Sequence, residues 1–118
     1  MKLVAGDIAD PAIASEIGEV GLWHDRAVLH FLTQESQWRG YAQNLRATVR
    51  PGGHAILAAF ALDGAEMCNG LPVRRYGVEM LTELVGDGFE LVREVDHTYH
   101  QPWGDPRPYV YALFRRVA

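Results

Sequence analysis

Apolar residues recur at spacings of three and four in two segments, which is the pattern of a helix that buries one face. The first segment spans residues 37–49 and the second spans residues 78–85. Thr33 or Ser36 is a candidate cap for the first helix, because short hydroxyl side chains satisfy the free backbone N–H groups at a helix start. Pro51-Gly52-Gly53 follows the first segment, and such a sequence ends a helix.

Shorter apolar runs predict strands. Residues 3–8 and 54–61 are almost continuously apolar, which is typical of strands covered on both faces. Residues 19–25 form a further run, residues 89–95 alternate with period two, and residues 109–114 form the last run. Strands alternate with helices until the final two strands, which are joined without a helix. We therefore expect an α/β fold with a mainly parallel sheet and an antiparallel final strand.

Composition narrows the class of protein. The 118 residues are 48% hydrophobic and 22% charged, which is typical of one globular domain spanning residues 1–118. The net charge of −4 without a basic run argues against nucleic-acid binding. Cys68 is the only cysteine, which excludes an internal disulfide and favours a reducing cytoplasm. The chain shows neither a signal peptide nor an apolar stretch long enough for a membrane span, so we expect a cytoplasmic protein.

Three stretches of the sequence together are similar to one known enzyme family. Residues 22–32 (LWHDRAVLHFL) are similar to the fourth strand of that family and the loop after it. Residues 45–59 contain the Arg50-Pro51-Gly52-Gly53 passage that is typical before the fifth strand. The third stretch runs from residue 70 (GLPVRRY) through residues 100–104 (HQPWG) to the last strand. Together the three stretches resemble bacterial class I S-adenosylmethionine-dependent methyltransferases. The resemblance implies a Rossmann-like fold, S-adenosylmethionine as cofactor and methyl transfer to a small polar acceptor.

The resemblance begins roughly 60–70 residues into such an enzyme, after the first strand and the glycine-rich loop that holds the cofactor. The chain itself contains no G-x-G-x-x-G sequence. We therefore expect a truncated fold whose cofactor binding and activity are impaired or absent in the chain alone. The alternatives are a non-catalytic scaffold that uses the fold for interactions, or a piece of a longer enzyme.

The family's strand order is 3-2-1-4-5-7-6, so the absence of strands one and two leaves a gap. The strand around Leu22 would have an open edge, and an unpaired apolar edge is a template for association. Either the strand around Val4 moves across to pair with it, or a second chain covers the edge. The second arrangement predicts a homodimer.

The resemblance also implies site residues at the ends of two predicted strands. Asp7 would accept a hydrogen bond from the adenine amino group, and Ile8 would pack on the adenine ring. Trp23, His24 and Asp25 would border the methionine part of the cofactor and the acceptor, with His24 as general base and Asp25 orienting it or binding the acceptor. The alternatives are that Asp7 is a turn residue and that Trp23 fills the core.

Three further residues are candidates for binding the acceptor. Arg74 and Tyr76 lie in a loop that borders the acceptor pocket by resemblance, where an arginine can meet an anionic group. Arg26 follows Asp25 directly and is the third candidate, although an ion pair with Asp25 is the alternative. Tyr76 alternatively anchors a solvated loop. The histidines do not have the spacing of a metal site, and no metal is expected.

Overall fold

The computed structural model describes residues 4–26, 28–68, 70–100, 104 and 106–118. Leu3 of the first predicted strand and residues 101–103 of the third family-like stretch lie outside this part. The elements in chain order are α1 (Ile13–Ile17), β1 (Val20–Arg26), the 3-10 helix η1 (Leu29–Phe31), α2 (Glu35–Thr48), β2 (Val49–Phe60), β3 (Met67–Cys68), β4 (Leu71–Pro72), α3 (Val78–Val85), β5 (Phe89–Tyr99) and β6 (Arg107–Arg116). Within the described ranges, no helix has the length and apolar character needed to cross a membrane.

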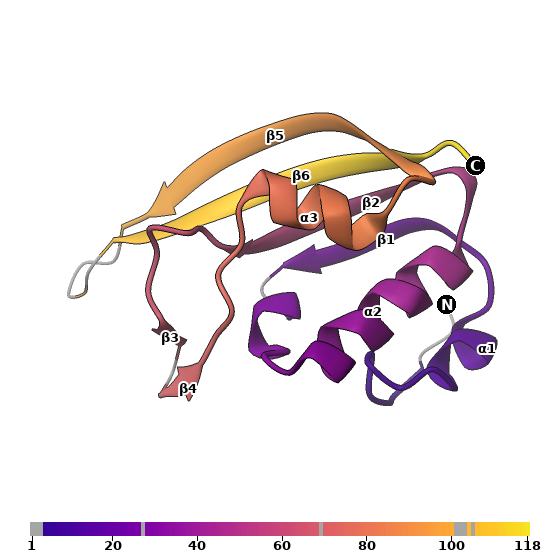
Figure 1. Cartoon of the computed structure of the whole chain (residues 1–118), viewed down its shortest axis with the longest axis horizontal. Coiled ribbons are helices and arrows are strands. Elements are labelled where there is room, and N and C mark those ends of the chain that lie inside the picture. Colours follow the sequence, from indigo (N-terminus) through magenta and orange to yellow (C-terminus); the bar gives the residue numbers. More distant parts are fainter. Residues whose placement is uncertain (1–3, 27, 69, 101–103, 105) are drawn as a thin grey trace.

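The main sheet has four strands in the order β1-β2-β6-β5, and β3 and β4 form a separate small hairpin (Figure 1). This order matches the 4-5-7-6 neighbours expected from the resemblance. β1 pairs with β2 in parallel, whereas β6 pairs antiparallel with both β2 and β5. The expectation of a mainly parallel sheet is therefore wrong. The last strand lies between two neighbours that both run opposite to it, so two of the three pairings become antiparallel.

The N-terminal segment differs from the prediction most clearly, because residues 4–8 form no strand. The side chain of Asp7 accepts a hydrogen bond from the N–H of Ala9 at 2.9 Å, which makes a local turn. The side-chain amide of Asn44 on α2 donates to the carbonyl oxygens of Ile8 (2.6 Å) and Asp10 (2.9 Å). These bonds supply the backbone partners that a neighbouring strand would otherwise provide.

The helices α2 and α3 lie on the same face of the main sheet (Figure 1). Between them and the sheet is a core whose strand residues alternate inward, as in Ala55, Leu57 and Ala59 of β2, all fully buried. The second predicted helix has the bounds of α3. The first was predicted two residues late, because Gln34 precedes it and donates its backbone N–H to Oε1 of Gln37 at 3.1 Å. Neither Thr33 nor Ser36 is the cap.

Gly40 lies where α2 meets the N-terminal segment. A Cβ added there would be 2.1 Å from the carbonyl oxygen of Ala9, so the backbone of one segment would have to move. Alanine ordinarily stabilises a helix interior by about 1 kcal/mol relative to glycine. We expect the opposite sign here, a loss of about 1–3 kcal/mol in Gly40→Ala, as in other overpacked sites.

Urea unfolding of Gly40→Ala measures this loss, with Gln43→Ala at an exposed position of the same helix as the control. The control should change the free energy of unfolding by only a few tenths of a kcal/mol. A Gly40→Ala protein more stable than the parent would mean that α2 does not pack against Ala9.

Candidate functional site

A chain of hydrogen bonds between buried side chains lies near the carboxyl end of β1. The alternation of β1 points Trp23 and Asp25 inward, and α2 brings Tyr41 against them. Trp23 donates its Nε1–H to the hydroxyl of Tyr41 at 2.9 Å, and that hydroxyl donates to Oδ2 of Asp25 at 2.6 Å. The Trp23 and Tyr41 rings meet edge to face at 5.3 Å. We refer to Trp23, Tyr41 and Asp25 as the inner network.

Asp25 also shapes the loop that follows β1. Its carboxylate accepts the backbone N–H groups of Val28 (2.9 Å) and Leu29 (3.0 Å), where the 3-10 helix begins. Those N–H groups have no partner within such a short helix, so the carboxylate satisfies them. Asp25 is only 6% exposed and is directed into the protein. Asp25 therefore positions the loop after β1. The neighbouring His24 points to the other face of the sheet.

The phenol groups of this region stay protonated. Burial raises the pKa of Tyr41 well above its ordinary value of 10, and the negative charge of Asp25 raises it further. Tyr41 therefore remains a hydrogen-bond donor to Asp25 throughout the biological pH range. Burial also raises the pKa of Tyr76, an effect that the hydrogen bond from Arg74 opposes.

A groove of about 380 Å³ follows β1 at the end of the sheet. Four of the predicted site residues contribute to its lining, namely Ile8, Trp23, His24 and Asp25. The other lining residues are mostly aliphatic: Ile17, Val20, Leu22 and Val28, with Tyr41. Its size is at the lower end of the range for small-molecule sites. Trp23, His24 and Asp25 therefore border a hollow, with Trp23 and Asp25 facing inward and His24 exposed. Their contact with a cofactor or an acceptor stays a prediction.

The remaining predicted residues lie elsewhere. Asp7 is exposed and bound to its own turn. Arg26 points to the face of the sheet opposite to Asp25, so the alternative ion pair between these two residues is not formed. Its guanidinium carbon lies 4.8 Å from the ring centre of Tyr99. Neither Asp7 nor Arg26 lines the groove beside Trp23.

Arg74 and Tyr76 form a separate cluster with Trp38 of α2. The guanidinium carbon of Arg74 lies 4.3 Å from the Trp38 ring centre and 4.7 Å from the Tyr76 ring centre. Arg74 also donates from Nη1 to the Tyr76 hydroxyl at 2.8 Å. Tyr76 is fully buried, so it anchors the loop as the alternative interpretation proposed. Arg74 is half-buried and is held in a defined orientation by two rings.

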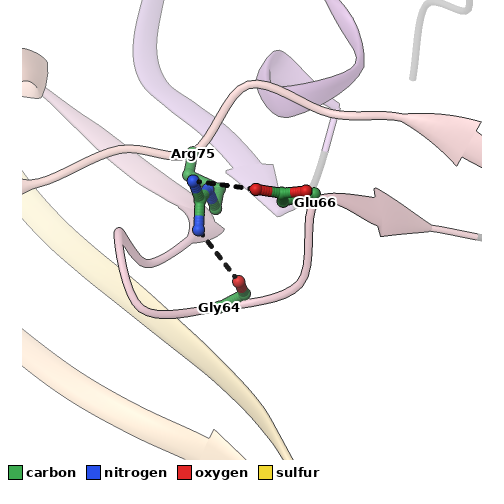
Figure 2. A network of polar contacts seen from close by, with 3 residues as sticks. All are labelled: Gly64, Glu66 and Arg75. Carbon is green, nitrogen blue, oxygen red and sulfur yellow. Dashed lines mark hydrogen bonds and ion pairs between the residues drawn. The ribbon is translucent and has the colours of Figure 1, made fainter.

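The loop before Tyr76 is tied to the sheet and to itself. The N–H of Tyr76 donates to the carbonyl oxygen of Phe60 at 2.9 Å, and the N–H of Arg74 donates to that of His30 at 2.7 Å. Figure 2 shows the second tie, in which Arg75 reaches the carbonyl oxygen of Gly64 (3.3 Å) and the carboxylate of Glu66 (3.5 Å). Arg74 is therefore placed beside η1 by backbone bonds.

Tyr41 and Trp38 were not identified as site residues from the sequence. Both were assigned to the buried stripe of a helix, which is correct but incomplete. A buried tyrosine or tryptophan needs a partner for its polar atom. Two such residues, Trp23 and Tyr41, with Asp25 close to them in the sequence were the signal for the buried network. In the described ranges no group of three or more histidine, cysteine or acidic residues is arranged to hold a metal ion.

No protein-family model and no curated protein matches this chain. Solved structures do match it. A SAM-dependent methyltransferase from Methanosarcina mazei has a TM-score of 0.66 at 10% identity, covering 85% of this chain and 60% of that one. The N-methyltransferase NodS from Bradyrhizobium japonicum WM9 has a TM-score of 0.63 at 18% identity, covering 86% and 53%.

A third match comes from a structure describing the conversion of a disulfide bond into a thioacetal group during echinomycin biosynthesis. Its TM-score is 0.68 at 17% identity, and the match covers 95% of this chain and 54% of that one. This chain spans about half the length of the solved structures that it matches. The fold is therefore that of part of a SAM-dependent methyltransferase, which confirms the structural side of the resemblance.

His30 beside this site provides a pH-dependent test. It is fully buried between Phe31 and Phe60, with both ring centres 4.5 Å away. Its Nδ1 accepts the N–H of Phe60 at 3.3 Å, whereas Nε2 has no partner among the described residues. Burial lowers the pKa of His30 below its ordinary value of 6.5, and the charge of Asp25 only partly offsets this.

The charged form of His30 is thus less favourable in the folded protein than in the unfolded chain. We expect the free energy of unfolding to be unaffected by this group above pH 6.5 and to decrease as the pH falls below it. His30→Asn keeps an acceptor near Nδ1 but removes the titration, so its stability should depend less on pH. Urea unfolding at pH 7 and pH 5 compares the two proteins, and equal pH dependence would contradict the prediction.

Proposed function

We propose that this chain carries the acceptor side of an S-adenosylmethionine-dependent methyl-transfer site for a small polar acceptor. The observation that carries the proposal is the groove beside β1, whose lining is held in place by the inner network. The match to part of the SAM-dependent methyltransferase fold supports it. The mostly aliphatic lining of the groove would suit the apolar parts of the cofactor. The part that grips the cofactor would come from another polypeptide or from further residues, because no glycine-rich loop is present.

Each groove residue has a proposed role that follows from its position. Ile8 and Trp23 form an apolar wall for the cofactor, which would bring a methyl group on a positively charged sulfur. The buried charge of Asp25 favours a cationic ligand nearby and holds the loop at Val28 and Leu29. His24 is exposed at the rim of the groove, where its imidazole can take a proton from the acceptor. Asp7 would be recruited to the adenine only if its turn opened.

Arg74 is the proposed contact for an anionic group of the acceptor. Stacking on Trp38 and the bond to Tyr76 fix its guanidinium before any ligand arrives, which lowers the entropic cost of binding. Tyr76 acts through Arg74, because its own side chain is fully buried. Arg26 lies on the other face of the sheet and would have to swing around the edge of β1 to reach the acceptor.

Titration with S-adenosylhomocysteine, followed by calorimetry and by NMR of the backbone amides, tests the cofactor site. We expect a dissociation constant of about 1 mM, or about −4 kcal/mol, because only part of the cofactor would be contacted. Shifts should centre on Ile8, Trp23 and His24. Val28→Arg should abolish them by filling the groove, and Val117→Arg should not. The two valines make a matched pair, since each is 49% exposed.

Absence of shifts at millimolar ligand, or equal effects of the two arginine variants, would contradict the proposed cofactor site. His24→Ala then separates binding from proton transfer. It should leave the affinity for S-adenosylhomocysteine nearly unchanged, because His24 is proposed to act on the acceptor.

A second candidate is a non-catalytic protein that self-associates through β1. Within the described part of the chain β1 ends the sheet, and its residues Val20–Trp23 carry no charge. The other end of the sheet is protected differently. β5 has an irregular register between Leu91 and Arg93 and carries charges along its length, both of which discourage edge-to-edge pairing. The observation therefore favours β1 as the associating edge.

Sedimentation velocity at about 100 µM tests for this dimer, since association depends on concentration. We expect Leu22→Lys to shift the protein to a monomer, because a lysine on an edge strand opposes pairing. Val95→Lys on β5 is the control and should leave the dimer intact. A parent protein that is monomeric at this concentration, or equal effects of the two variants, would rule the edge dimer out.

A further inference from the structure

One face of the main sheet is left without a helix in the described part of the chain. Figure 1 shows α2 and α3 together on the other face. Register and alternation assign the side chains of the uncovered face, which we call the open face. They are Leu22, His24 and Arg26 of β1, His54, Ile56, Ala58 and Phe60 of β2, Tyr109, Tyr111, Leu113 and Arg115 of β6, and Glu90, Arg93, Val95, His97 and Tyr99 of β5.

At the carboxyl end of β1, side chains of the open face contact one another and cover this end of the sheet. Arg26 of β1 and Tyr99 of β5 reach towards each other across the two central strands, and the hydroxyl of Tyr99 is hydrogen-bonded to that of Tyr111. Ala58 of β2 lies between them in the sheet order and is only 1% exposed. The Arg26–Tyr99 contact and the Tyr99–Tyr111 hydrogen bond therefore cover this end of the open face. Burial, together with the bond from Tyr99, raises the pKa of Tyr111 to about 12, so the phenol stays neutral.

The middle of the open face has no such cover. Leu22 is 54% exposed and Val95 is 41% exposed, with Ile56 and Leu113 half-buried in the sheet between them. Ile56 and Leu113 are directly paired across β2 and β6. These four residues form an aliphatic strip that crosses the four strands diagonally, since Leu22 pairs with His54 and Val95 pairs with Tyr111, one step to either side of the Ile56–Leu113 pair. Three interstrand spacings of about 4.8 Å make the strip about 14 Å wide, enough for one helix of about 10 Å diameter and part of a second.

The charges around the strip are predominantly positive, although the chain as a whole carries −4. Arg93 and Arg115 lie beside it on β5 and β6, with His24 and His97 near its ends. The one carboxylate assigned to this face is Glu90, which pairs with Arg115 at 3.7 Å. The acidic residues Glu79 and Glu83 are on α3, and Glu94 points to the helix side of the sheet. The open face is therefore basic on an acidic protein.

We propose that the open face docks an amphipathic helix of a different polypeptide, with its apolar side on the strip and acidic residues towards Arg93 and Arg115. The basic side chains of the open face complement an acidic partner, which favours such a helix over the two alternatives that follow. A second copy placed face to face would bring the same arginines together. A single-stranded nucleic acid stacks its bases on free ring faces, whereas the rings of β5 and β6 on this face contact one another or Arg26. The proposal does not depend on methyl transfer. It uses no residue of the inner network, and it shares only Leu22 and His24 with the lining of the groove.

The test uses the 118-residue chain and two labelled peptides of about 18 residues. Both carry leucine along one helical side, and the polar positions are glutamate in one peptide and lysine in the other. Fluorescence anisotropy should give the glutamate peptide a dissociation constant on the order of 100 µM or below. The lysine peptide should bind at least about tenfold more weakly, and added salt should reduce this difference.

Two variants locate the binding. Val95→Glu places a negative charge in the exposed part of the strip and should lower the affinity for the glutamate peptide about tenfold or more. Met67→Glu in the separate β3–β4 hairpin is the control, because Met67 is 50% exposed and lies away from the main sheet. Both positions are exposed, so both variants should fold, which circular dichroism checks. Hydrogen exchange should slow at residues 22–26 and 93–97 when the glutamate peptide is added.

Four outcomes would overturn the proposal. They are no binding of the glutamate peptide, equal affinity for the two peptides, a Val95→Glu variant that binds as the parent does, and protection on α2 or α3 in place of β1 and β5. Two competing occupants are tested in the same experiment. A labelled oligouridine that binds the parent protein but not the Val95→Glu variant would assign the face to nucleic acid. A dimer that Val95→Glu dissociates would assign it to a second copy.

Discussion

The fold depends on the burial of one carboxylate. Asp25 is removed from water, and an ionised carboxylate tolerates this only when its oxygens are fully paired. Its partners come from three places in the chain: the hydroxyl of Tyr41 on α2 and the N–H groups of Val28 and Leu29 before and in η1. The carboxylate therefore joins the end of β1, the loop after it and the first long helix. Removing it would leave two backbone N–H groups and the O–H of Tyr41 without an acceptor in the interior, at a cost of about 1–3 kcal/mol for each.

The same constraint explains the shape of the groove. Because Trp23 and Asp25 are both engaged with Tyr41, they cannot turn outward, and the wall beside β1 has a fixed form. Val28 and Leu22 remain exposed on either side of that wall. The groove is thus rigid on its inner side and open on its outer side. Rigid placement of a few polar groups beside an apolar wall is what positions a ligand for reaction.

The sequence predicts the features of this structure that depend on local patterns better than those that depend on contacts between distant segments. The α3 helix and the order of the four strands follow from local periodicity together with the family-like passages. The parallel character of the sheet was predicted wrongly, because helix and strand alternation suggests parallel crossovers and says little about where the last strand inserts. The segment around Val4 was predicted as a strand because its residues are apolar. Whether an apolar run pairs as a strand depends on a free neighbouring strand, and here Asn44 satisfies the backbone of that segment through bonds that no local pattern reveals.

For the candidate site, the sequence predicted positions better than directions. Residues 23–25 were correctly placed at the end of a strand, but the two faces of that strand lead to different surroundings. Trp23 and Asp25 enter the inner network, while His24 and Arg26 join the open face. One strand therefore takes part in two surfaces of opposite character, an apolar groove over a buried negative charge and a basic sheet face. A partner that covered the open face would also bury His24 and Arg26. Binding there would then alter access to the rim of the groove, and the two surfaces would be coupled through a strand of seven residues.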